Sequence, residues 1–253
     1  MLKRCGVILL VLALMGSPVM AMTGQEVIDR VKDEYGDFQS QAVTMVLKTA
    51  DKNGPINERE VLLLTKKYGE KEKSLLKFLA PTDVQGVGLL DQGDDVMYMY
   101  LPEFHKVRRI AGSAKNGSFM GTDFTYRDLS LINYDSSDYE SELIDEDNQV
   151  YELELIAKDQ EESGYEKILM TVRKSDFFPT KLVFYNKEGK LQKELLAFDV
   201  TQYGKYKFPK RLEMNDFLSS HRTEVLLNEP EFDLDLKDDL FTTRTLQRSR
   251  IRY

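Results

Sequence analysis

The residues best suited to chemistry lie between Asp94 and Leu131, in the stretch DDVMYMYLPEFHKVRRIAGSAKNGSFMGTDFTYRDLSL. Here Arg108 and Arg109 precede a glycine-rich loop with bulky apolar side chains. The stretch offers neither a nucleophile with its base nor a set of metal ligands. Its residue types suit an amphiphile, because methionine and phenylalanine accept acyl chains while guanidinium groups suit a polar head. The alternative is a core strand followed by a packed loop.

An enzymatic function is not indicated by the motifs. His105 and His221 are the only histidines, and neither has a cysteine or a second histidine at ligand spacing. The run from Gly117 to Gly121 resembles a nucleophile elbow, but its central residue is Phe119 rather than serine. We therefore expect a non-enzymatic protein with no catalytic residue, no metal and no cofactor.

The surrounding sequence predicts one helix followed by many strands. Thr23 and Glu26 form a capping-box pattern, after which apolar residues follow one helical stripe. From Gln41 onward the apolar period changes to two, with turns about every ten residues, which is typical of an antiparallel barrel or sandwich. One face of the sheet is expected to be apolar and the other charged. The alternating apolar sets include Val43, Met45, Leu47; Val96, Tyr98, Tyr100; Leu153, Leu155; Ile168, Met170, Val172; and Thr223, Val225, Leu227.

The order of the central motifs resembles that of a known family. GVGLLDQGDDVMYMYLP, then KVRRI, then GSFMGTDFTYRDL, is similar to the LolA-like family of outer-membrane lipoprotein-sorting proteins. The similarity extends from the opening helix to LFTTRTLQR, and points to the branch found beside inner-membrane export pumps of the RND type. It implies a mainly β fold, a half-open antiparallel β-barrel around a hydrophobic cavity. An N-terminal helix and the helical loops, with the segment from Gly112 to Leu131, would cover that cavity.

The resemblance also implies a function: a periplasmic carrier that moves a lipid, or the acyl chains of a lipoprotein, between envelope membranes. An RND-type transporter is the implied membrane partner, and we expect a monomer. The cargo stays open between lipoprotein, hopanoid-like lipid and another amphiphile. Arg108 and Arg109 are candidates for contacting a head group or partner, or for fixing the loop. The candidates for lining or gating the cavity are Met97, Met99, Phe119, Met120, Phe124 and Tyr126.

Two alternatives belong to other functional classes. The same half-barrel serves envelope-stress regulators that sense lipid or mislocalised lipoprotein and bind an anti-sigma factor. Those regulators usually carry a second domain, for which we expect no room before Tyr253. The other alternative is an accessory subunit of an export pump that binds no lipid.

The first residues predict export from the cytoplasm. Lys3 and Arg4 precede an apolar run of about ten residues, and Val19-Met20-Ala21 has the small residues that precede a cleavage site. We expect a signal peptide over residues 1–21 and one half-barrel domain over residues 22–253. The run is shorter than the roughly 20 residues of a membrane span. Cys5, the only cysteine, would be removed with the signal, so disulfides would not stabilise the mature chain.

The charge balance limits the partners. The chain has a net charge of −8, and losing Lys3 and Arg4 would take it to −10. This argues against binding to nucleic acid or general adhesion to anionic lipid. Near the end the sequence turns basic, and such a tail is either solvated or docks on a partner. Its basic residues are Arg244, Arg248, Arg250 and Arg252.

Overall fold

The computed structural model describes residues 22–51, 55–69, 71–94, 96–131, 139–160 and 163–253. The predicted signal peptide, residues 1–21, lies outside them. The helices are α1 (Gly24–Tyr35), α2 (Tyr126–Leu131) and α3 (Thr243–Leu246), with short 3-10 helices at Pro102–Phe104, Gly112–Asn116 and Asp238–Phe241. The strands are β1 (Ser40–Asp51), β2 (Asn57–Tyr68), β3 (Lys71–Ala80), β4 (Gly88–Asp91), β5 (Met97–Leu101), β6 (Lys106–Ile110), β7 (Tyr139–Glu146), β8 (Val150–Ala157), β9 (Lys167–Arg173), β10 (Phe178–Tyr185), β11 (Leu191–Phe198), β12 (Thr201–Tyr203), β13 (Tyr206–Phe208), β14 (Arg211–Asp216), β15 (His221–Leu227) and β16 (Glu231–Phe232).

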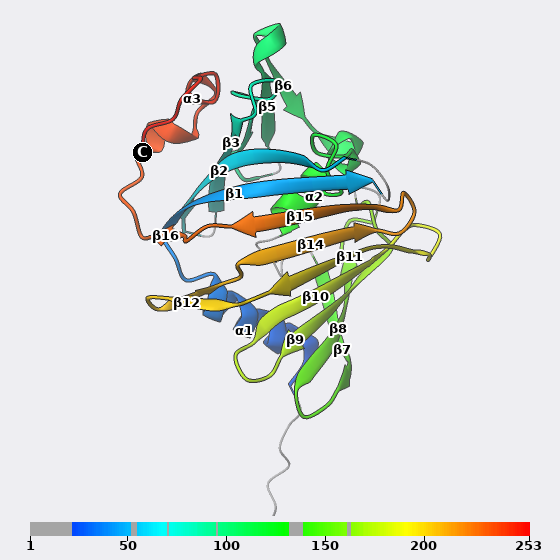
Figure 1. Cartoon of the computed structure of the whole chain (residues 1–253). Helices are drawn as coiled ribbons and strands as arrows, with labels where there is room; N and C mark the ends of the chain where they lie inside the picture. Colours follow the sequence, from blue (N-terminus) through cyan, green and yellow to red (C-terminus); the bar gives the residue numbers. More distant parts are fainter. Residues whose placement is uncertain (1–21, 52–54, 70, 95, 132–138, 161–162) are drawn as a thin grey trace, which may run out of the picture.

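One large antiparallel sheet dominates the fold. Its strands follow the order β6-β5-β4-β3-β2-β1-β15-β14-β11-β10-β9-β8-β7, and β16 pairs with the start of β1. Within the described residues the outermost strands β6 and β7 do not pair with each other, so the sheet curves without closing (Figure 1). The predicted half-open antiparallel architecture is confirmed.

The concave face of the sheet holds the main apolar core. Alternate residues along the strands point into it, as the period of two predicts. Helix α1 covers part of this face with Val27, Ile28 and Val31, and the predicted capping box between Thr23 and Glu26 is present. Gly24 lets the helix start close to β7, since a Cβ there would lie 2.7 Å from the carbonyl carbon of Glu142.

The convex face differs between the two halves of the sheet. On β8 and β9 the buried and partly exposed residues alternate, and charged side chains face outward as expected. On β2 and β3 both faces are buried, so the expectation of one charged face is wrong there. The residues that cover this second face come from the C-terminal segment, which Figure 1 shows on the outside of the sheet: Leu236, Leu240, Phe241 and Leu246.

A buried lysine fastens this C-terminal cover. Lys77 on β3 is 0% exposed, and its Nζ donates to the carbonyl oxygens of Gly86 and Leu246, both at 2.6 Å. The ammonium lies 5.1 Å from the centre of the Tyr100 ring. Burial lowers the pKa of Lys77 to about 8, because a low-dielectric site disfavours the charged form.

Candidate functional site

The six predicted lining residues belong to the concave core. Met97, Met99, Phe119 and Phe124 are buried in this cluster, and Met120 and Tyr126 pack against it. The Tyr126 hydroxyl donates to the Met99 sulfur at 3.1 Å. The structure thus gathers residues of β5 and of the 117–126 loop on one apolar surface. Whether they line a cavity for a ligand stays a prediction.

The loop over residues 117–126 is a small hairpin that inserts an aromatic ring into the core. The Phe119 amide donates to the Phe124 carbonyl at 2.8 Å, and the Thr122 amide donates to the Phe119 carbonyl at 3.0 Å. Met120 and Gly121 both have positive φ, at 52° and 74°, as a tight hairpin turn of this hand needs. The loop therefore aims Phe119 inward by means of its own backbone conformation.

The Phe119 ring meets two other rings on the concave face. Its centroid lies 5.8 Å from that of Phe78 on β3 and 5.5 Å from that of Tyr126. The guanidinium of Arg59 on β2 donates to the Met120 carbonyl oxygen. Phe119 thus occupies apolar space, while the turn that carries it is held by a charged side chain of β2.

A buried carboxylate ties the loop to β15. Asp123 accepts a hydrogen bond from the Thr223 hydroxyl at 2.7 Å, and its own backbone amide donates to that hydroxyl oxygen at 2.9 Å. His221 Nδ1 lies 2.7 Å from Asp123 Oδ2. These residues are about 100 positions apart in the chain, so the contact fixes the loop against the sheet.

A second buried carboxylate ties the loop to β11. Asp128 Oδ2 accepts from the Thr125 amide at 2.7 Å, and the Asp128 amide donates to the Thr125 hydroxyl at 3.0 Å, which is the capping box of α2. The same carboxylate pairs with Lys193 at 3.2 Å and accepts from the Tyr165 hydroxyl at 2.7 Å. Burial, together with Asp128, raises the pKa of the Tyr165 phenol, so Tyr165 stays a hydrogen-bond donor.

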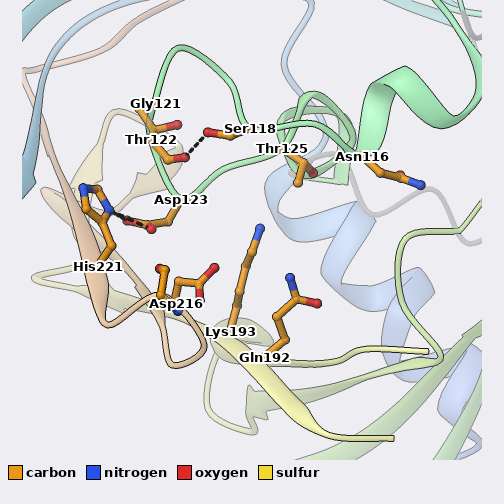
Figure 2. Close-up of a pocket in the computed structure, with 11 residues that line it drawn as sticks. Asn116, Ser118, Gly121, Thr122, Asp123, Thr125, Gln192, Lys193, Asp216 and His221 are labelled. Carbon is orange, nitrogen blue, oxygen red and sulfur yellow. Dashed lines mark hydrogen bonds and ion pairs between the residues drawn. The ribbon is translucent and has the colours of Figure 1, made fainter. Parts of the chain in front are cut away.

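A polar pocket of about 370 Å³ opens between these two anchors. Figure 2 shows Lys193 rising from β11 toward the loop, with Asp123 and His221 on one side and Asn116 on the other. The pocket is separate from the six predicted lining residues, none of which contributes to it. It is lined by Asn116, Ser118, Gly121, Thr122, Asp123, Thr125, Gln192, Lys193, Asp216, Ser219 and His221.

The pocket lies where the concave face changes from apolar to polar. Residues two apart on a strand share a face. On β11 the buried Leu195 is followed on that face by Lys193, and on β15 Val225 is followed by Thr223 and then His221. One end of the apolar surface therefore carries a cluster of hydrogen-bonding groups.

The two predicted arginines lie elsewhere, on the edge strand β6. Arg108 pairs with Met99 and Arg109 with Tyr98 across the ladder, so only Arg108 shares the face of Met99. Both are exposed, and within the described part of the chain neither forms an ion pair. Neither lines the polar pocket. Charges on an unpaired edge also discourage strand addition by another molecule.

Sequence reasoning missed the polar pocket. His221 was weighed as a catalytic residue or metal ligand, and Lys193 and Asp123 were not singled out. The available signal was the alternation along the strands: Lys193 lies on the same face of β11 as the apolar Leu195, and His221 on the same face of β15 as Val225. Among the described residues, no group of three or more histidine, cysteine or acidic side chains is placed to hold a metal ion.

Exposed apolar residues stand near the same end of the sheet. Phe217 and Leu218, in the turn between β14 and β15, are 49% and 59% exposed. Ile56 follows β1, whose end residue Asp51 pairs with His221.

No helix in the described ranges combines the length and apolar character needed to cross a bilayer.

Comparisons with known proteins agree on the architecture. Residues 70–248 match the model of a family described as "Uncharacterized protein". A domain assigned as an outer membrane lipoprotein-sorting protein, from Vibrio parahaemolyticus, is 28% identical, with a TM-score of 0.81 over 89% of this chain and 98% of that one. A DUF1329 family protein from Desulfovibrio piger is 26% identical, with a TM-score of 0.83 over 88% and 98%.

A third structure shows the same fold at lower identity. The LolA superfamily protein from Nitrosomonas europaea is 23% identical, with a TM-score of 0.74 over 89% of this chain and all of that one. No match was found among curated proteins.

Proposed function

The chain belongs to the LolA-like family, and we propose that it is a periplasmic carrier that binds a lipid, or the acyl chains of a lipoprotein. The concave apolar face is the observation that carries this proposal. Part of its cover is the 117–126 loop, which places the rings of Phe119 and Phe124 in the core and is tied to the sheet by polar contacts. Such a cover exposes apolar surface when it lifts, whereas a packed helical layer would have to unfold.

The proposed binding mode is non-covalent. Phe119 and Phe124 occupy the apolar surface in the empty protein, and acyl chains take their place beside Met97 and Met99 when the loop moves. Met120 and Tyr126 then line or gate the entrance. The free-energy cost of opening is low, because the apolar surface that the moving rings uncover is covered again by the acyl chain.

Co-purification tests this proposal directly. The protein is isolated from the periplasmic fraction, and native mass spectrometry with lipid extraction is expected to find a bound amphiphile. N-terminal sequencing of the same sample is expected to begin at Met22 if residues 1–21 are a cleaved signal peptide, which leaves residues 22–253 as one domain. A protein that carries no amphiphile, and takes up none when vesicles are added, contradicts the carrier function.

Hydrogen exchange tests the moving part. Adding amphiphile is expected to change amide exchange within residues 112–131, while the amides of β9 serve as an internal reference. Unchanged exchange in that segment with binding intact would give the loop a static packing role.

We further propose that an inner-membrane transporter of the RND type is the partner, as the family resemblance implies. The exposed Arg108 and Arg109 suit an acidic docking surface, with an attraction that weakens as salt rises. Replacing both by glutamate is expected to reduce crosslinking to the membrane partner, more at low salt than at high salt. Lys158→Glu with Lys190→Glu is the charge-matched control, because both lysines are exposed in connecting segments, directly after β8 and directly before β11.

A further inference from the structure

We propose that the polar pocket between the 117–126 loop and strands β11, β14 and β15 binds the head group of the carried amphiphile, and that this head group is uncharged and rich in hydroxyls. The inference rests on the proposed carrier function. It adds a site for the polar end of the cargo and a chemical class for that end.

The position of the pocket follows the direction of the strands. Leu195, Met214 and Val225 are neighbouring buried residues of the concave core on β11, β14 and β15. Two residues further toward the turns, the same face carries Lys193 and Asp216. An acyl chain lying on the apolar part therefore has its polar end at the pocket.

The charges of the pocket are already compensated within the protein. Lys193 pairs with Asp128 at 3.2 Å, and Asp123 is engaged by His221 and by the Thr223 hydroxyl. An anionic head group would meet the carboxylates of Asp123 and Asp216. A cationic head group would meet the buried ammonium of Lys193, which is 4% exposed. An uncharged group avoids both repulsions.

The pocket also offers hydrogen-bonding groups that the described part of the chain does not use. Asp216 accepts from the backbone amides of Leu218 and Ser219 through Oδ1, and its Oδ2 has no bond within the described residues. The side-chain amide of Gln192 likewise makes none there. Figure 2 shows Gln192 beside Lys193 on one wall of the pocket, with Asp216 near them.

This set of groups fits a polyol or sugar. Each hydroxyl both donates and accepts, so adjacent hydroxyls suit a carboxylate acceptor next to ammonium and amide donors. Lys193 and Asp216 are direct partners across the β11–β14 ladder, which puts a donor and an acceptor side by side. The hydroxyls of Ser118 and Ser219 add further polar contacts at the pocket wall.

Three amphiphiles with ten-carbon chains and different head groups test the inference: uncharged decyl maltoside, cationic decyltrimethylammonium and anionic decanoate. Each is titrated into the purified protein below its micelle concentration, and binding is followed by calorimetry. Decyl maltoside is expected to bind most tightly. Gln192→Leu and Asp216→Asn are each expected to weaken its binding by about five- to tenfold, the effect of one lost hydrogen bond.

The control is Gln149→Leu, the same chemical change at an exposed turn between β7 and β8, which should leave binding unchanged. Unfolding curves confirm that each variant is folded. Equal affinity for the three amphiphiles, or no loss in both pocket variants, overturns the head-group inference and leaves the carrier function standing. Failure of all three amphiphiles to bind overturns the carrier function as well.

Discussion

The strands β2 and β3 and the strands β8 and β9 belong to one sheet but bury different numbers of faces. On β3, the consecutive residues from Leu75 to Phe78 are all buried, because α3 and its flanks cover the convex face. On β9, Ile168, Met170 and Val172 are buried while the residues between them are partly exposed. The 117–126 loop is tied to β2 by Arg59 and to β15 by the contacts of Asp123 with Thr223 and His221. Strands β2 and β3 are thus packed on both faces, whereas β8 and β9 are packed on one face, so we expect substitutions on the convex side to destabilise the first pair more.

The largest expected effect concerns the second buried face. Phe241→Ala removes a ring that is 1% exposed on the convex side of β2 and β3, and should lower the free energy of unfolding by about 3–5 kcal/mol. Thr171→Ala changes a partly exposed residue on the convex side of β9 and should lower the free energy of unfolding by no more than about 1 kcal/mol. Urea unfolding measures both. Similar costs would remove the distinction between the halves.

A slightly smaller effect is expected at the 117–126 loop, which is tied to β2 and β15. Phe119→Ala should lower the free energy of unfolding by about 3 kcal/mol, since the ring is 1% exposed. If acyl chains replace this ring in the bound state, the same variant should bind decyl maltoside at least as tightly as the wild type. Calorimetry decides the point, because weaker binding would mean that Phe119 supports the site instead of occupying it.

The smallest effect concerns how the stability contributed by the buried Lys77 depends on pH. Burial holds its pKa at about 8, below its usual 10.5. Between those values the unfolded chain binds the proton and the folded chain has lost it, so the free energy of unfolding should rise with pH. Across pH 8 to 10 the gain is at most about 2–3 kcal/mol. A neutral amine still has two N–H bonds for the carbonyl oxygens of Gly86 and Leu246.

Lys77→Met is the reference for this measurement. Burial raises the pKa of Tyr35 and Tyr68, and those shifts lower stability as pH rises. The test is therefore the difference between wild type and Lys77→Met across pH 8 to 10, from urea unfolding. A difference that does not grow over this range would show that Lys77 is as basic in the folded protein as it is in water.

Local patterns predicted much of the fold but little of the pocket. The capping box at Thr23 and the alternation on β9 each depend on residues a few positions apart, so the sequence displays them directly. The convex cover depends on contacts between Lys77 and Leu246, and the loop anchor on contacts between Asp123 and His221. Such pairs are visible only once strand order and register are known, because periodicity assigns a face without assigning a partner.

The C-terminal cover also has a consequence for synthesis. A ribosome produces β2 and β3 long before Leu236 to Leu246, so Leu62, Leu64 and Leu75 stay uncovered for most of translation. A chain that stops short of Leu246 would present an apolar sheet surface, together with Lys77 deprived of an acceptor. Proteases and chaperones recognise such surfaces. A chain truncated before Leu246 is therefore expected to be cleaved by proteases sooner than a chain that includes this segment.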